Sequence, residues 1–146
     1  MKVLVTNPPW PGPGYGARSD VRWPHKRKDK YLEYPIYLAY VVAILEKSRI
    51  DVEFIDGVAD DLSIKAFVDA VKEIDPDIIA MECSTPSIQY DLLTAKKLKE
   101  ELEDTFIVLL GSHPTYFHKE ILMENKFVDA IARGEFDLTI RDLSFA

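Results

Sequence analysis

The sequence predicts an α/β domain with a doubly wound parallel sheet, and two observations support this fold class. Short apolar runs, nearly continuous in Val, Ile and Leu, recur along the 146 residues, as expected for strands covered on both faces. Between them, apolar residues recur every three or four positions, as in amphipathic helices. Because neighbouring parallel strands need a crossover, this alternation predicts one domain over residues 1–146 with helices on both faces.

The elements follow in chain order. Five strands are predicted, at residues 3–6, 52–55, 78–81, 107–110 and 128–132. This rhythm favours a Rossmann-like, flavodoxin-like sheet of order 2-1-3-4-5. Apolar stripes predict helices over residues 64–74 and 88–102, and another helix is expected to begin at Phe136. The segment 35–47 is apolar on most of its circumference, so we expect the most buried helix there.

Composition and charge exclude several classes of protein. The net charge of −7 disfavours nucleic acid as the main partner, and the basic patch at residues 25–28 is interrupted by Asp29 and favours a solvated loop. Cys83, the single cysteine, excludes an internal disulfide and any zinc or iron–sulfur site held by cysteines of this chain alone. No apolar run reaches the roughly 18 residues of a membrane helix, and no signal-peptide pattern is present. We therefore expect a cytoplasmic protein without a nucleic-acid or membrane partner.

Residues 7–34 form the one long segment without periodicity. Structureless loops longer than about 12–15 residues are uncommon in compact domains and are usually functional or disordered. This segment follows the first strand, at the sheet edge where such folds bind ligands. We expect it to be functional because of its aromatic residues, which are Trp10, Tyr15, Trp23, Tyr31 and Tyr34.

The loops after the other strands hold small and hydroxylated residues beside predicted helix starts, where backbone N–H groups accept polar or anionic ligands. Single residues such as Ser84, Thr85 and Thr115 can equally be helix caps. Nucleotide fingerprints are incomplete, because Gly12 and Gly14 supply only half of Gly-x-Gly-x-x-Gly. A phospho-acceptor aspartate is missing where a receiver-like regulator would need one. No catalytic set is evident.

Several segments together resemble the N-terminal cobalamin-binding domain of radical-SAM proteins. That group includes the anaerobic magnesium-protoporphyrin monomethyl ester cyclase and corrinoid-dependent methyltransferases. The matching segments follow the family's order over nearly the whole chain, at residues 3–9, 37–46, 54–56, 85–88, 111–115 and 129–135.

This resemblance implies cobalamin across the carboxyl edge of the sheet, with its nucleotide tail running into the domain. The predicted cofactor-binding residues are Asn7, Pro8, Trp10, Thr85, Ser87, Gly111, Ser112, His113, Gly134 and Glu135. Because the family's cobalamin domains typically lack Asp-x-His-x-x-Gly, as this chain does, we predict that His113 is not a cobalt ligand and that the corrinoid is bound base-off. Ser112 departs from the family's second glycine, and residues 134–137 depart from its Gly-Glu-Gly-Glu run.

The resemblance also implies a second domain. A radical-SAM domain binds S-adenosylmethionine and holds a 4Fe–4S cluster with Cys-x-x-x-Cys-x-x-Cys, which Cys83 alone cannot supply. We therefore expect the full protein to continue beyond Ala146 into that domain, and this chain to bind a corrinoid without turning over substrate alone. The alternative is a non-enzymatic Rossmann-like module with a degenerate ligand site that serves as a docking domain.

Overall fold

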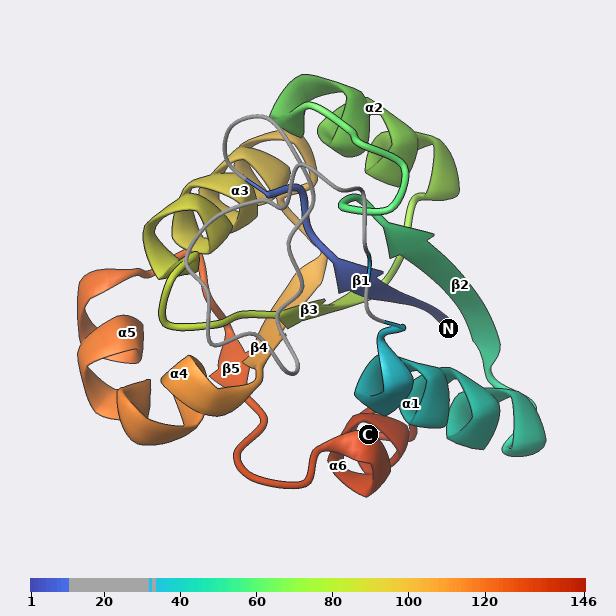
Figure 1. Cartoon of the computed structure of the whole chain (residues 1–146). Coiled ribbons are helices and arrows are strands. Elements are labelled where there is room, and N and C mark those ends of the chain that lie inside the picture. Colours follow the sequence, from blue (N-terminus) through green and yellow to red (C-terminus); the bar gives the residue numbers. More distant parts are fainter. Residues whose placement is uncertain (11–31, 33) are drawn as a thin grey trace.

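The computed structural model describes residues 1–10, 32 and 34–146. Five strands form one parallel sheet of order β2-β1-β3-β4-β5 (Figure 1). They are β1 (Lys2–Asn7), β2 (Asp51–Asp56), β3 (Ile78–Glu82), β4 (Phe106–Leu110) and β5 (Ala130–Ile131). The predicted fold class and strand order are confirmed.

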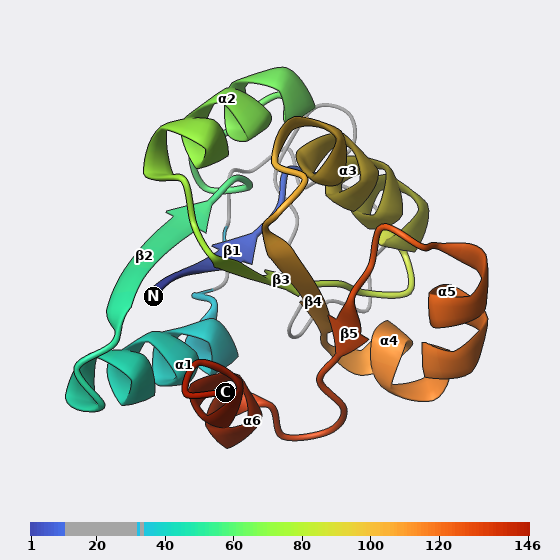
Figure 2. The same ribbon diagram turned by 180° about the vertical axis from the view of Figure 1, so that it is seen from behind.

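Helices cover both faces of the sheet. Figures 1 and 2 show α1 (Ile36–Lys47) and α6 (Asp137–Leu143) on one face, and α2 (Ile64–Ile74) and α3 (Ile88–Glu101) on the other. The short helices α4 (Ser112–Tyr116) and α5 (His118–Glu124) follow β4 and lie toward the β5 edge. None of the helices in the described part of the chain is long and apolar enough to cross a membrane.

The two faces of the sheet bury separate apolar cores because successive side chains of a strand alternate between faces. Leu4, Ile79 and Met81 pack with the α2 and α3 side chains, whereas Val3, Val5 and Ile78 pack with α1 and α6. By the same alternation Glu82, at the end of β3, shares the α1 and α6 face with Ile78 and Ala80. A charged side chain thus continues an apolar row at the carboxyl edge of the sheet.

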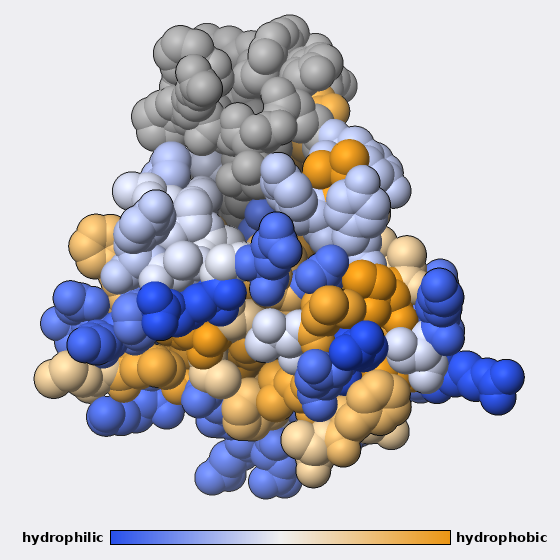
Figure 3. Space-filling view, turned by 90° about the horizontal axis from the view of Figure 1, so that it is seen from below, coloured by the Kyte–Doolittle hydropathy of each residue, from blue (hydrophilic) through white to orange (hydrophobic). Residues whose placement is uncertain are grey.

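The prediction that residues 35–47 form the most buried helix is wrong. Helix α1 buries Leu38, Val41 and Leu45, but Tyr37 and Tyr40 are 49% and 55% exposed. One face of α1 contacts the sheet and another contacts α6, which leaves the remaining apolar side chains uncovered. Figure 3 shows apolar groups lying between charged ones on the face seen from below.

The segment after β4 also differs from prediction. The sequence predicts a loop at residues 112–115, but these residues form most of α4, which is followed by α5 after a single residue. Gly111, with φ of 108°, turns the chain out of β4 directly into this helix. Pro114 lies in the first helical turn, where the missing N–H costs no intrahelical bond.

Candidate functional site

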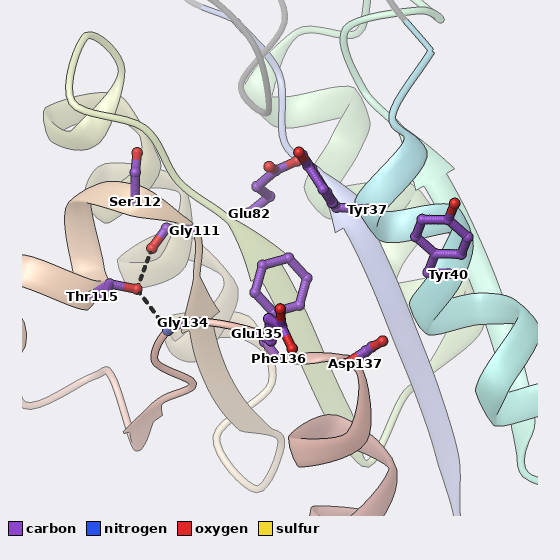
Figure 4. A pocket seen from close by; sticks show the side chains of 10 residues that line it. All are labelled: Tyr37, Tyr40, Glu82, Gly111, Ser112, Thr115, Gly134, Glu135, Phe136 and Asp137. Carbon is purple, nitrogen blue, oxygen red and sulfur yellow. Dashed lines mark hydrogen bonds between the residues drawn. The ribbon is translucent and has the colours of Figure 1, made fainter.

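The carboxyl ends of β3, β4 and β5 meet at one edge of the sheet, because all five strands are parallel. A pocket of about 550 Å³ opens there between the sheet and helices α1 and α6 (Figure 4). It is lined by Tyr37, Tyr40, Glu82, Gly111, Ser112, Thr115, Gly134, Glu135, Phe136 and Asp137.

Gly111 forms a wall of this pocket by a close backbone approach that no other residue permits. Its φ of 108° and ψ of −175° fall in a region that is essentially restricted to glycine. A Cβ at this position would lie 2.3 Å from the carbonyl oxygen of Cys83. Gly134 also has a positive φ, 68°, but a Cβ there would meet nothing within 4 Å. The backbone is therefore tightly packed at Gly111 and open at Gly134.

Thr115 connects these two glycines. Its hydroxyl donates to the carbonyl oxygen of Gly111 at 2.7 Å and accepts from the backbone N–H of Gly134 at 3.1 Å. The sequence leaves open whether Thr115 contacts a ligand or satisfies local backbone groups. The structure shows that its hydroxyl does have local backbone partners. The bond to Gly134 also fixes the loop after β5 against α4, on the pocket's wall.

A buried polar network holds the loop after β3. The Ser87 hydroxyl donates to Asp91 Oδ2 at 2.6 Å and lies 2.8 Å from the Ser84 hydroxyl oxygen. The backbone N–H of Ser84 points to the same Asp91 oxygen at 3.4 Å. Ser87 and Asp91 are fully buried. The network therefore fixes the shape of the loop from beneath, and Ser87 does not line the pocket.

His113 lies beside the pocket and not in its lining. Its Nδ1 is 3.2 Å from the Thr85 hydroxyl, and its ring stacks on Phe117 with centroids 4.6 Å apart. Partial burial lowers the pKa of His113, and the charge of Asp91 opposes that shift. The imidazole is thus held against the loop after β3 and favoured in its neutral form.

The remaining predicted residues lie at the other end of the edge. Asn7 ends β1, Pro8 and Trp10 follow it, and all three residues are buried. The Asn7 side-chain amide donates to Asp56 Oδ1 at 3.0 Å, which also accepts from two backbone N–H groups of the turn after β2. The predicted functional segment 7–34 and the basic patch at 25–28 fall mostly on residues 11–31 and 33, which lie outside the described residues.

The structure thus brings four of the ten predicted residues into one pocket: Gly111, Ser112, Gly134 and Glu135. Thr85 and His113 lie beside it as a bonded pair. Sequence reasoning did not include six lining residues in the predicted site, namely Tyr37, Tyr40, Glu82, Thr115, Phe136 and Asp137. The available signal was Glu82 itself, a charged residue that ends a strand of otherwise apolar side chains. Among the described residues, no group of three or more His, Cys, Asp or Glu side chains could hold a metal ion.

Comparisons with known proteins agree with the predicted resemblance. The family model of the B12 binding domain matches residues 26–144. An uncharacterised methyltransferase of Pyrococcus horikoshii is 34% identical over 75% of this chain and 24% of its own length. An anaerobic magnesium-protoporphyrin IX monomethyl ester cyclase of Rubrivivax gelatinosus is 30% identical over 98% of this chain and 24% of its own length. The chain therefore spans about a quarter of the length of these relatives.

Among solved structures, the cobalamin-dependent S-adenosylmethionine radical enzyme OxsB, with aqua-cobalamin and S-adenosylmethionine bound, matches with a TM-score of 0.75. The match covers 98% of this chain and 18% of that chain at 16% identity, so it supports the fold. The match to the family model supports cobalamin as the cofactor predicted from the sequence. Because the family model covers most of the sequence, this chain belongs to the B12-binding domain family.

Proposed function

We propose that this chain binds cobalamin at the carboxyl edge of its sheet, as the corrinoid-binding module of a larger radical-SAM methyltransferase or cyclase. The observation that carries the proposal is the pocket between the strand ends and helices α1 and α6. In open α/β sheets, ligands bind outside the carboxyl ends of the strands. The family membership supports the class of ligand, and the pocket supports the proposed location.

The residues present fit the nucleotide tail of a corrinoid. A volume of about 550 Å³ is within the range of small-molecule pockets. Tyr37, Tyr40 and Phe136 offer aromatic surface to a planar base. The approach of Gly111 to Cys83 leaves no side chain at that wall. Ser112, Gly134 and Glu135 are more exposed lining residues and would hold the amide-bearing part of the cofactor at the mouth of the pocket.

We further propose that the cofactor is bound base-off and without a histidine on cobalt. The His113 ring is bonded to Thr85 and stacked on Phe117, outside the lining of the pocket. A cobalt ligand would have to leave both contacts. When bound, cobalamin supplies methyl transfer or assists radical chemistry, whereas the residues of this chain bind and orient it. No residue of the chain is proposed as an acid–base catalyst.

The rest of the activity is proposed to reside in a further domain of the full protein. The relatives are about four times longer than the matched region. An iron–sulfur cluster and bound S-adenosylmethionine would belong to that part, because Cys83, the only cysteine here, is buried in the core. The presence of a single cysteine in the sequence also fits the cytoplasmic location that we propose.

The test is a titration of the purified chain with hydroxocobalamin, followed by desalting and a visible spectrum. We expect one retained corrinoid per chain with a base-off spectrum, unchanged in His113→Ala. Ser112→Trp, which fills the pocket mouth, should abolish retention. The matched control is Ser48→Trp at the far end of α1, outside the pocket. Loss of a histidine-coordinated spectrum in His113→Ala would refute the base-off proposal. No retention by the chain or by the full protein would refute cobalamin binding and favour a docking domain.

A further inference from the structure

Glu82 is the most deeply buried charged residue in the lining of the pocket. It ends β3, and only 3% of its surface is exposed. Strand alternation directs its side chain to the α1 and α6 face of the sheet. Figure 4 shows the carboxylate directed from the strand end toward the side of the pocket where Tyr37 lies.

The charged side chains among the other lining residues are hydrogen-bond acceptors. Glu135 and Asp137 add two carboxylates, and no Lys, Arg or His occurs among the described residues that line it. Tyr37, Tyr40 and Phe136 supply aromatic surface. A ligand group that enters this pocket is therefore favoured when it is planar and carries N–H donors.

We propose that Glu82 selects the nucleotide base of the bound corrinoid and favours a base with an exocyclic amine, such as adenine, over dimethylbenzimidazole. This inference rests on the proposed function, because it concerns the same pocket. When it is ionised, the Glu82 carboxylate has about four lone-pair sites and only accepts hydrogen bonds, so it can then accept from an amine in addition to the partners it already has. The free ring nitrogen of dimethylbenzimidazole is itself an acceptor. Its approach to Glu82 would require the uptake of a proton from solution, whereas the amine needs none.

The size of the preference follows from the chemistry of the bond. A hydrogen bond to a charged group is strong when it is buried, and each factor of ten in affinity corresponds to about 1.4 kcal/mol. We expect the chain to bind an adenine-bearing corrinoid about tenfold or more tightly than cobalamin with dimethylbenzimidazole. Cobinamide, which has no nucleotide, should bind more weakly than either form.

The experiment measures the Kd of all three corrinoids by visible titration of the wild-type chain, Glu82→Gln and Glu53→Gln. Glutamine keeps the shape of Glu82, removes its charge and offers an N–H₂ group to the ring nitrogen, so the preference for adenine should vanish or reverse. Glu53 is an exposed glutamate on β2, outside the pocket, and serves as the charge-matched control. Cobinamide affinity and the thermal midpoint report whether each variant is folded. Glu82→Asp, which withdraws the carboxylate by one methylene, gives a second variant that should weaken the preference.

Each outcome decides between the hypotheses. Equal affinity of the wild-type chain for the two nucleotide-bearing corrinoids, or an unchanged ratio in Glu82→Gln, overturns the role of Glu82 and leaves the proposed function intact. Failure to bind any of the three corrinoids overturns both. Free adenosine is added to test whether the pocket binds the adenine of the corrinoid tail or the adenine of a separate nucleotide. Competition with the adenine corrinoid supports a site for the corrinoid tail, whereas binding that adds to it would assign the pocket to a separate nucleotide.

Discussion

Replacing Gly111 by alanine should be among the most destabilising single methyl additions in this domain. The new Cβ would lie 2.3 Å from the carbonyl oxygen of Cys83, where real Cβ atoms essentially never occur. The backbone conformation alone, φ of 108° with ψ of −175°, carries about 1–3 kcal/mol of strain for a residue with a side chain. Relieving the overlap adds about 1–3 kcal/mol, as in overpacked cores. We expect the free energy of unfolding to fall by roughly 2–6 kcal/mol, a large part of the total for a small domain.

The matched control is Gly134→Ala. Its φ of 68° also disfavours alanine, but nothing lies within 4 Å of the added methyl group. The left-handed conformation alone should cost about 1–2 kcal/mol. Urea unfolding of both variants, followed by circular dichroism, measures the difference. If the two substitutions lower stability equally, the contact between the exits of β3 and β4 is not the constraint that the structure indicates.

Three further predictions concern the polar contacts of the site. Asp91→Ala removes the shared acceptor of Ser84 and Ser87 and should lower the free energy of unfolding by about 2 kcal/mol, whereas Asp69→Ala, at an exposed ion pair on α2, should change it by less than about 0.5 kcal/mol. Comparable urea midpoints for the two variants would contradict this. Thr115→Val breaks the bond to Gly134, so the Gly134 amide should exchange its hydrogen about fivefold faster by NMR, and an unchanged rate would show that the bond is not formed in solution. Because burial holds the pKa of His113 below its ordinary value, the unfolded chain takes up this proton first as pH falls through about 6.5, and stability decreases. His113→Gln should therefore lose less stability than the wild type between about pH 7 and pH 5, and equal losses would argue against the shift.

Much of the fold could be predicted from the sequence, because the spacing of apolar residues indicates where strands and helices form. The strands at β1, β3 and β4 are continuous apolar runs, and their predicted centres agree with the structure. The stripe of Phe67, Val68 and Val71 faces the core of α2 as its spacing requires. β5 is shorter than predicted, with only Ala130–Ile131 in the strand. There Asp129 and Ala132 still donate to β4 but lie at the ends of the ladder.

The candidate site was harder to predict from the sequence, because its residues come together only through three-dimensional contacts. The sequence pointed to Gly111 and Gly134 at strand ends, but it could not show that Thr115 connects them. The family resemblance implied that Ser87 lies in the site. The structure instead directs the Ser87 hydroxyl to Asp91, four residues along the same chain segment. Such side-chain pairing depends on rotamers and burial, which periodicity does not specify.

The two clearest disagreements between local pattern and structure lie at the pocket itself. Glu82 occupies a strand position whose neighbours on the same face, Ile78 and Ala80, are apolar core residues. Tyr37 and Tyr40 are left uncovered on a helix whose composition predicted burial. A buried carboxylate opposes folding stability when considered alone, and an exposed aromatic face is typical of an interaction or ligand-binding surface. Sequences generally satisfy such local rules except where function requires otherwise, and here both exceptions line one pocket at the ligand-binding edge of the sheet. Their coincidence is a structural argument for a ligand at this place that is independent of any likeness to other proteins.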